Sequence, residues 1–355
     1  MRFSVVIGAY NVARFLEKSI KELMNQSFCD FEVILVDDGS TDGITPALCD
    51  KVAKTEHRIK VIHQKNGGLG AARNTGIEAA TGEYICFYDV DDVIHNNALE
   101  VINENLTAEG TDIFMFSYNE ISPEYYISYP CIFNKMNLIG NEIKVYYPYE
   151  FSGVRFNNGF AWNKVYNRKF LIDNNLRFGN QAIQQDEVFN LKVYQKAQRI
   201  ILSNEILYDY YVYNSGNNRS RYIPNRLDIY KNIQSEFFDI LDEWNIQDKR
   251  FDIFVCTKHI NNVITALTYN LFHKDCPLDD IQKRDYIRNA FEDDDLQISI
   301  HVLNDYHYRF NSIISRLYFS SICKRNVKRF IFTMRLAKCR DFIASTYRKI
   351  KRFVK

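Results

Sequence analysis

Four short, almost wholly apolar runs lie between residues 3 and 88, and stretches with the apolar spacing of an amphipathic helix separate them. A strand of a parallel sheet is covered by helices on both faces, so it is expected to be apolar throughout. The predicted strands are residues 3–9, 31–36, 59–63 and 83–88. One predicted helix follows a cap at Asn11, a second follows Ser40, and a third spans residues 71–80. This alternation indicates βαβ units, so we predict an α/β fold with a doubly wound, mostly parallel sheet.

The pattern is less regular after residue 92. Helices are predicted over 96–106, 161–174 and 186–196, strands over 112–118, 200–202 and 206–213, and a hairpin or an excursion from the sheet over 119–135. From about residue 224 almost only helical spacing remains. The sequence therefore predicts an α/β domain over residues 1–220, followed by a helical region over 221–355.

Charge is distributed unevenly along the chain. The formal net charge is +1, but residues 323–355 contain 12 Lys or Arg and one acid, so the rest of the chain carries −10. A basic amphipathic helix is typical of a segment that lies on an anionic membrane. The alternative, a solvated face of a helical subdomain, stays open. Nucleic acid is not expected as a partner, because the tail has no recognisable reader motif.

Eight cysteines are scattered along the chain without a CxxC pair, and several stand in apolar runs. We therefore expect buried thiols in a reducing compartment rather than a disulfide framework. The apolar start of the chain is too short for a signal peptide, and no run of 18 apolar residues suggests a transmembrane helix. These features predict a cytoplasmic protein, placed on the inner face of the membrane if the basic tail binds there.

Three carboxylates follow the fourth predicted strand, at Asp89, Asp91 and Asp92. Ligands of open α/β sheets bind outside the carboxyl ends of the strands. Crowded carboxylates repel one another unless a cation or a proton resolves their charge, and a divalent ion that carries substrate phosphates does so. The alternative is a solvated turn with a helix cap, since a bare D-x-D is common.

Two further acids, Asp37 and Asp38, follow the second predicted strand. Acids at this place in nucleotide-binding folds accept hydrogen bonds from a base or a ribose, although an Asx turn is the simpler alternative. The glycine-rich segment 67–70 then opens a helix, and such a turn lets the backbone approach an anion. Arg73, one turn into that helix, can reach a phosphate or a ribose. Its default alternative is a surface or an ion-paired arginine.

Asp186 stands at the start of a predicted helix. A carboxylate held there can act as a general base toward a hydroxyl. Acids are also common at helix starts because they interact favourably with the helix dipole.

Six segments together resemble the motifs of family 2 glycosyltransferases of the GT-A fold, over about residues 3–215. They read SVVIGAYN, VDDGSTD, NGGLGAARNTG, FYDVDD, WNKVYNRKFL and QDEVFNLKVY. The last two are similar to those of the subgroup that builds bacterial surface polysaccharides. The resemblance implies an inverting, metal-dependent transfer of a sugar from a nucleotide-sugar, expected to be a UDP-sugar, to a hydroxyl of a saccharide or of a lipid-linked acceptor.

The resemblance also implies roles for single residues. Tyr10 would stack on the base of the donor, Asp38 would bind uracil or its equivalent with support from Asp37, and Arg73 would approach the donor phosphates. The metal, Mg²⁺ or Mn²⁺, would be bound by Asp91, with Asp89 on the same ion or on the ribose. Asp186 would be the catalytic base. The segment Trp162, Asn163 and Lys164 would lie near the acceptor, and Arg219 is a candidate for a diphosphate contact.

Two other functions fit parts of the sequence. Residues 89–94 match the D-x-D-x-(T/V) motif of haloacid-dehalogenase-like phosphotransferases, in which Asp89 would be the nucleophile and Asp91 an acid. That motif normally ends the first strand of its sheet, whereas three predicted strands precede it here. A binding-only nucleotide-sugar module is the second alternative, and the retained acids at 89, 91 and 186 argue against it.

Overall fold

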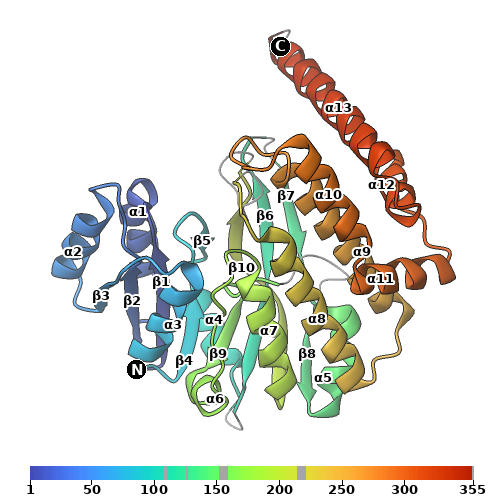
Figure 1. Ribbon diagram of the computed structural model, residues 1–355. Coiled ribbons are helices and arrows are strands. Elements are labelled where there is room, and N and C mark those ends of the chain that lie inside the picture. The colour runs from blue at the N-terminus through green and yellow to red at the C-terminus, as the bar shows by residue number, and fades with distance from the viewer. Residues whose placement is uncertain (108–109, 125–126, 152–158, 214–220, 354–355) are drawn as a thin grey trace. The chain divides into compact units, whose positions relative to one another are not determined.

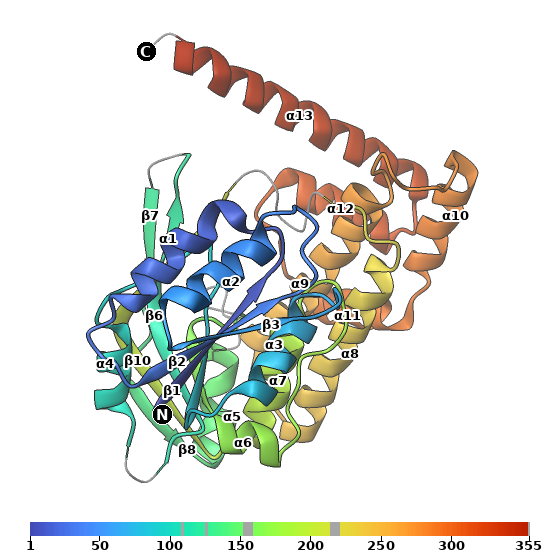
Figure 2. The same cartoon turned by 90° about the vertical axis from the view of Figure 1, so that its left-hand side faces the viewer.

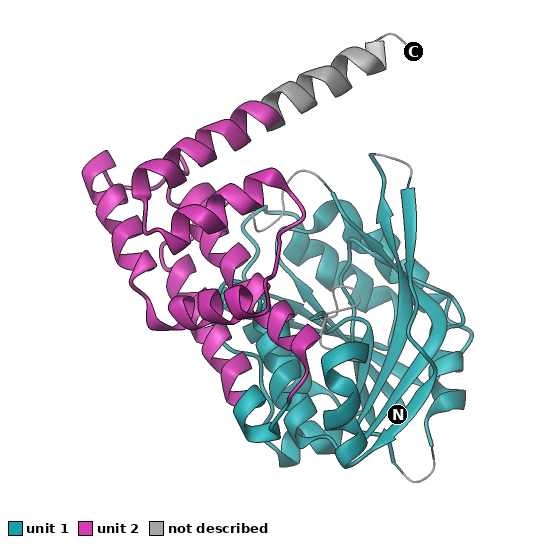
Figure 3. Cartoon of the chain, turned by 90° about the vertical axis from the view of Figure 1, so that its right-hand side faces the viewer, with its two compact units in different colours: residues 1–217, 240–246 teal, residues 218–239, 247–355 magenta. Residues whose placement is uncertain are grey.

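The computed structural model describes residues 1–107, 110–124, 127–151, 159–213 and 221–353, with side chains as far as residue 340. The chain divides into two compact units (Figure 3). Unit 1 comprises residues 1–217 and 240–246, and unit 2 comprises residues 218–239 and 247–355. Arg219 lies outside the described residues.

Unit 1 is built on one mixed sheet (Figure 1). Its described strands run in the order β3-β2-β1-β4-β9-β6-β10-β5, while β7 pairs with β6 and β8 pairs with β10. The strands are β1 (Phe3–Ala9), β2 (Phe31–Asp37), β3 (Ile59–His63), β4 (Tyr84–Phe87), β5 (Val93–Ile94), β6 (Ile113–Ser122), β7 (Ile127–Cys131), β8 (Met136–Ile139), β9 (Lys164–Asn167) and β10 (Arg199–Tyr211).

Strand β1 stands between β2 and β4 and is parallel to both, and β3 is parallel to β2. In this register Ala9 lies opposite Asp37, and Val6 lies opposite Phe87. The carboxyl ends of β1, β2 and β4 therefore meet at one edge of the sheet. The residues that follow β1, β2 and β4, including both predicted acid clusters, leave the sheet at that edge.

Helices cover both faces of this parallel part. Those of unit 1 are α1 (Ala13–Met24), α2 (Thr45–Thr55), α3 (Leu69–Ala79), α4 (Ala98–Asn105), α5 (Asn141–Tyr146), α6 (Arg168–Asp173) and α7 (Gln185–Lys196), with a π-helical turn, η1 (Tyr147–Phe151). Helices α1 and α2 lie side by side (Figure 2), joined by Lys51 and Glu17 at 2.7 Å. Alternate residues of β1 face them, such as Val5 and Ile7, and Val6 faces α3.

Helix α3 approaches β1 so closely that its sequence must carry glycine. A Cβ on Gly76 would lie 2.1 Å from Cγ1 of Val6, and a Cβ on Gly70 would lie 2.7 Å from the carbonyl oxygen of Gly179. Neither neighbour leaves room for a side chain. The close approach brings the side chain of Arg73, which is on α3, to the edge of the sheet where the acids lie.

The prediction of an α/β fold with a parallel βαβ core is confirmed, and so is the hairpin, formed by β6 and β7. The single helix predicted over 161–174 is wrong. That stretch forms β9, which is antiparallel to β4 and β6, and then the short helix α6. The two strands predicted over 200–213 are one strand, β10, with an irregular register between Ser203 and Tyr208.

Unit 2 contains helices only, in the part of it that the structure describes. They are α9 (Lys249–Thr265), η2 (Ala266–Asn270), α10 (Asp280–Phe291), α11 (Asp294–Asp305), α12 (Ile313–Cys323) and α13 (Val327–Phe353), together with most of α8 (Arg226–Trp244). Within the described part of the chain, no helix combines the length and the hydropathy needed to cross a bilayer.

The cysteines are free thiols, and Cys49, Cys86 and Cys256 are buried. The expectation that all of them are buried is wrong, because Cys29, Cys323 and Cys339 are exposed.

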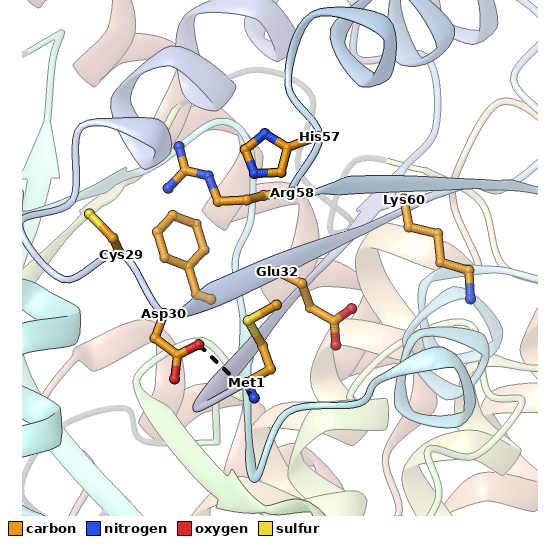
Figure 4. A pocket seen from close by; sticks show the side chains of 8 residues that line it. Met1, Cys29, Asp30, Glu32, His57, Arg58 and Lys60 are labelled. Atoms are coloured by element: carbon orange, nitrogen blue, oxygen red, sulfur yellow. Dashed lines mark ion pairs between the residues drawn. The ribbon is translucent and has the colours of Figure 1, made fainter.

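A hollow of about 310 Å³ lies at the start of β1, β2 and β3, lined by residues that include Met1, Glu32 and Arg58 (Figure 4). It stands at the amino ends of these strands, opposite the edge where the acids gather.

The contact between Gly76 and Val6 gives a first prediction. Gly76→Ala should lower the free energy of unfolding by about 1–3 kcal/mol, because the added methyl group overpacks the interface between α3 and β1. Denaturant unfolding measures this. Val6→Ala removes the opposing methyl groups, so the double variant should lose less stability than the sum of the two single variants. Additive losses would contradict the proposed clash.

Candidate active site

The end of β1 presents one exposed ring and one structural amide. The side chain of Tyr10 is 47% exposed. Asn11 follows in the left-handed backbone region with φ of 55°, which Asn tolerates better than most residues. Its Oδ1 accepts hydrogen bonds from the backbone N–H groups of Thr41 (2.8 Å) and Asp42 (3.1 Å). Asn11 therefore joins the loops after β1 and β2. It does not cap α1, whose N-cap is Val12.

Asp37, the last residue of β2, is buried and holds its own loop and β3. Its Oδ1 accepts from the backbone N–H of Ser40 at 3.1 Å, and its Oδ2 lies 2.8 Å from Nδ1 of His63. Burial alone would raise the pKa of Asp37, but the hydrogen bonds from Ser40 and His63 outweigh it and lower the pKa. The other ring nitrogen of His63 lies 3.2 Å from Asp50 in α2. These contacts raise the pKa of His63.

Asp38 is also buried, and it binds the glycine-rich loop that precedes α3. Its Oδ1 accepts from Nε2 of Gln64 (2.7 Å) and from the backbone N–H of Gly67 (2.9 Å), and its Oδ2 accepts from the N–H of Gly68 (2.8 Å). Successive N–H groups of a turn form a concavity suited to an anion. Here the carboxylate of Asp38 occupies that position and fixes the start of α3.

Arg73 joins two acids that are far apart in the sequence. Its Nη2 donates to Oδ1 of Asp89 at 3.0 Å, and its Nη1 donates to Oδ1 of Asp186. The guanidinium is buried and lies against the rings of Phe87 and Phe178, 5.6 and 5.4 Å from their centroids. Burial opposes its charge, but the two carboxylates raise its pKa above the ordinary value. Of the default alternatives, a surface arginine is wrong, because Arg73 is buried, whereas an ion-paired arginine agrees with its contacts to Asp89 and Asp186.

The three carboxylates after β4 point in different directions. Burial raises the pKa of Asp89, while the charge of Arg73 acts in the opposite sense. Asp91 is exposed at the surface. Asp92 is buried and accepts from the hydroxyl of Tyr208 (3.0 Å) and from the backbone N–H of Tyr211 (2.8 Å), both in β10. Asp92 therefore serves to connect this turn to β10.

Asp186 lies in the first turn of α7, about one fifth exposed. Its Oδ1 accepts from Arg73, and its Oδ2 accepts from the backbone N–H of Ala161 at 3.2 Å. These two donors fix the position of the carboxyl group. The structure thus brings a partly exposed acid to the same edge as Asp89. A carboxylate with these properties can accept a proton from a hydroxyl.

The predicted acceptor segment is buried. Trp162 stacks on Tyr208 at 4.5 Å, and Asn163 and Lys164 have no exposed surface. Burial lowers the pKa of Lys164 to about 7, and the charge of Asp186 opposes that shift. The three side chains therefore lie behind the surface of the site.

The possible metal ligands are few. Within the residues that the structure describes, no group of three or more His, Cys, Asp or Glu side chains is arranged to hold a metal ion. Among the described carboxylate oxygens at this edge, those of Asp91 and the second oxygen of Asp89 make no hydrogen bond to another residue.

The site contains residues that sequence analysis missed. His63 holds Asp37, and Asn74 of α3 binds the backbone N–H and C=O of Phe178 at 2.8 and 2.9 Å. Asn190 of α7 binds the carbonyl groups of Gly159 and Phe160. Asn74 stands in the motif NGGLGAARNTG, so the sequence does carry a signal for this residue. Nothing in the sequence pairs His63 with Asp37.

Known proteins are similar to this chain in sequence or in fold. A family model described as "Glycosyl transferase family 2" matches residues 4–171. An "Uncharacterized glycosyltransferase EpsJ" of Bacillus subtilis is 30% identical over 235 residues, which are 66% of this chain and 67% of the relative. A "Cholesterol galactosyltransferase" of Borreliella burgdorferi is 32% identical over 58% of this chain and 59% of its own length. The chain spans 30% of another relative, "Glycosyltransferase GlyA" of Streptococcus pneumoniae.

Solved structures with the same fold have lower identity. TarS 1-349 of S. aureus, solved in complex with UDP, matches with a TM-score of 0.62 at 18% identity, over 95% of this chain and 91% of its own. A complex of the same protein with UDP-GlcNAc also has a TM-score of 0.62. Mannosyltransferase PcManGT of Pyrobaculum calidifontis, in complex with GDP-Man and Mn²⁺, matches at 0.51 with 14% identity, over 96% of this chain and 87% of its own.

The contacts of His63 give a prediction about pH. Its folded-state pKa is raised above the ordinary 6.5, so its contribution to stability is complete below about pH 6.5 and is lost as the pH rises through the folded-state value. Asp37, whose pKa is lowered, stays ionised as a partner down to about pH 4. The free energy of unfolding of His63→Gln should therefore differ most from the parent between about pH 4 and 6.5.

Denaturant unfolding over a pH series measures the difference. His57→Gln is the matched control, because that side chain is 93% exposed and its contact with Glu56 is at the surface. The free energy of unfolding of this control should change with pH in parallel with that of the parent. If His63→Gln also ran parallel to the parent, the proposed pH-dependent contribution of His63 to stability would be refuted.

Proposed function

The chain belongs to family 2 of the glycosyltransferases, and from this premise we propose that it moves a sugar from a UDP-sugar to the hydroxyl of a saccharide or of a lipid-linked acceptor, with inversion at the anomeric carbon and with a divalent cation. The observation that carries the proposal is the position of Arg73, which holds Asp89 and Asp186 at one edge of the sheet. A donor-side carboxylate and a candidate base thereby lie within the reach of one substrate. Family membership decides against the phosphotransferase alternative.

The donor would bind along the ends of β1, β2 and β4. The exposed ring of Tyr10 offers a surface on which a base stacks, and Asp37 and Asp38 lie beside it at the next strand end. Uracil as the base is supported by the complexes of TarS with UDP and UDP-GlcNAc. The complex of PcManGT with GDP-Man shows that this fold also accommodates a purine donor.

The residues at this edge fit a hard divalent cation. Asp91 is an exposed carboxylate, and one oxygen of Asp89 remains after its contact with Arg73. Mg²⁺ and Mn²⁺ accept one or two carboxylates together with substrate phosphates and water. Asp91, with Asp89, would hold the ion, and the Mn²⁺ in PcManGT supports this choice. When bound, the ion neutralises charge that develops on the leaving diphosphate.

Asp186 would act as the general base. Its carboxylate takes the proton of the acceptor hydroxyl while that oxygen forms a bond to the anomeric carbon and the bond from that carbon to the diphosphate breaks. A direct displacement inverts the anomeric centre and requires one base rather than a nucleophile paired with an acid. The donors Arg73 and Ala161 hold the carboxylate in a single orientation for this step.

The helix α13 supports a membrane-bound acceptor, in the synthesis of a surface polysaccharide. Phe330 and Met334 are buried and attach the helix to unit 2. Phe332 and Leu336 face solvent, 60% and 40% exposed, and Lys328 is exposed one turn before them. Apolar side chains flanked by Lys and Arg suit an anionic membrane surface. The same composition continues through residues 341–355, whose side chains lie outside the description.

Turnover measurements test the proposal. UDP-GlcNAc, UDP-glucose, UDP-galactose and GDP-mannose would be supplied with Mn²⁺ and short alkyl glycosides, and release of nucleoside diphosphate would be recorded. Asp186→Asn should reduce the rate with the active donor on the order of 10²–10⁴-fold, the usual contribution of a general base. Its affinity for UDP should stay within about twofold, because the proposed base would face the acceptor and asparagine keeps an oxygen that can accept from Arg73.

Asp91→Asn is the matched variant, since it makes the same chemical change at the donor side. It should weaken UDP binding in the presence of Mn²⁺ and leave binding without metal unchanged. Equal loss of UDP affinity in both variants would refute the assigned base. UDP binding by the parent without turnover on any donor would instead favour a binding-only module.

Co-sedimentation with vesicles tests the membrane surface. The full chain should bind vesicles that contain phosphatidylglycerol and not neutral phosphatidylcholine vesicles. Phe332→Ser with Leu336→Ser should weaken binding by about tenfold or more, since the apolar area that these two side chains would bury in the membrane is lost. Ile313→Ser is the control, because Ile313 is 70% exposed but belongs to α12. Equal weakening by the control variant, or equal binding to neutral vesicles, would contradict the proposed surface.

A further inference from the structure

One of the two groups that hold Asp186 is a backbone N–H. The N–H of Ala161 donates to Oδ2 of Asp186 at 3.2 Å, opposite the side held by Arg73. Ala161 lies in a turn before β9, outside any helix or strand. The direction of its N–H therefore depends on the groups that hold this turn.

Two side chains hold the turn by its carbonyl groups. Nδ2 of Asn190 donates to the carbonyl oxygens of Gly159 and Phe160, each at 3.0 Å. The ammonium group of Lys164 donates to the same oxygen of Phe160 and to Oδ1 of Asn163, the latter at 2.7 Å. Phe160 O is thus bound from α7 and from β9 at once.

The carbonyl of Phe160 and the N–H of Ala161 belong to one peptide unit. A peptide unit is planar and trans, so its C=O and N–H point in opposite directions and rotate together. Fixing the oxygen with Lys164 and Asn190 consequently fixes the hydrogen that Asp186 accepts. A donor to the carbonyl also polarises the peptide and strengthens its N–H as a donor.

Lys164 is an unusual residue for a merely structural contact. Its side chain is fully buried, and burial of an ammonium group costs several kcal/mol unless the charge is compensated. The carboxylate of Asp186 supplies part of the compensation. Because none of the lysine is exposed, an acceptor at the surface cannot contact it directly.

We propose that Lys164 is a positioning residue for the catalytic base: together with Asn190 it orients the Phe160–Ala161 peptide, and this peptide orients the carboxylate of Asp186 toward the acceptor hydroxyl. The inference rests on the proposed role of Asp186 as general base. It gives the WNK segment a function behind the site in place of contact with the acceptor.

Kinetics of Lys164→Met test the inference, because methionine keeps the apolar stem and removes the ammonium group. The turnover number with the active donor and acceptor should fall on the order of 10- to 100-fold, as expected when a reacting group is slightly misplaced. The acceptor KM and the affinity for UDP with Mn²⁺ should stay within about twofold. In the Asp186→Asn background the same substitution should have no further effect, since Lys164 acts through Asp186.

Two more variants make the test decisive. Asn190→Ala acts on the same peptide from α7 and should show the same loss of turnover number, even if Lys164→Met does not fold. Lys258→Met is the matched control: burial also lowers the pKa of Lys258 to about 7, but it lies in α9 near Phe237 and Phe254. Its turnover should equal that of the parent.

The outcomes separate the inference from the proposed function. A raised acceptor KM with unchanged turnover number would make Lys164 an acceptor contact and overturn the inference. Equal losses in the parent and in Asp186→Asn would overturn it as well, because the lysine would then act independently of the base. If Asp186→Asn alone turned over at the rate of the parent, Asp186 would not be the base. That result would contradict the proposed function, and it would be seen before Lys164 is changed.

Discussion

The buried guanidinium of Arg73 is the group on which the rest of the site depends. It reaches Asp89 after β4 and Asp186 at the start of α7, and it lies against the rings of Phe87 and Phe178. Loss of one partner of a buried ion pair costs about 3–5 kcal/mol, since it leaves a charge without compensation. The three charged groups therefore constrain one another, and the donor side of the site and the candidate base are held in one fixed relation.

Close packing makes this arrangement possible. Arg73 reaches the two acids because α3 lies against β1, and α3 can lie there because residue 76 has no side chain to meet Val6. Six residues earlier, Gly70 allows the chain at Gly179 to approach, and Asn74 then binds the backbone of Phe178. The Gly, Arg and Asn residues of this one motif thus act together: two glycines set the distance, the asparagine fixes the neighbouring loop, and the arginine uses the resulting position.

The sequence predicted those parts of the fold and of the site that are specified by neighbouring residues in the chain. The apolar runs of β1 to β4 and the acids that follow them specified a parallel sheet and the edge where the site lies. The helix predicted over 161–174 was wrong because four residues of β9 are too few for periodicity to reveal, and their strand state comes from pairing with β4 and β6. The burial of Arg73 was also out of reach, because its partners lie 16 and 113 residues away. The pattern of apolar and polar residues locates the end of a strand, whereas the partners of a side chain depend on tertiary packing.

The contacts of the acidic side chains show how tertiary packing changes the chemistry expected from the sequence. Crowded carboxylates suggested a cation as the common solution, yet the structure neutralises or binds most of them internally. Asp38 binds backbone N–H groups, Asp92 binds Tyr208, and Asp89 shares Arg73 with Asp186. Asp91 alone among the acids after β4 is exposed. With so few carboxylate oxygens from the chain, a divalent cation bound at this edge, as we propose, would depend on donor phosphates to complete its coordination. In that case metal and donor would bind cooperatively, each strengthening the binding of the other by the same factor.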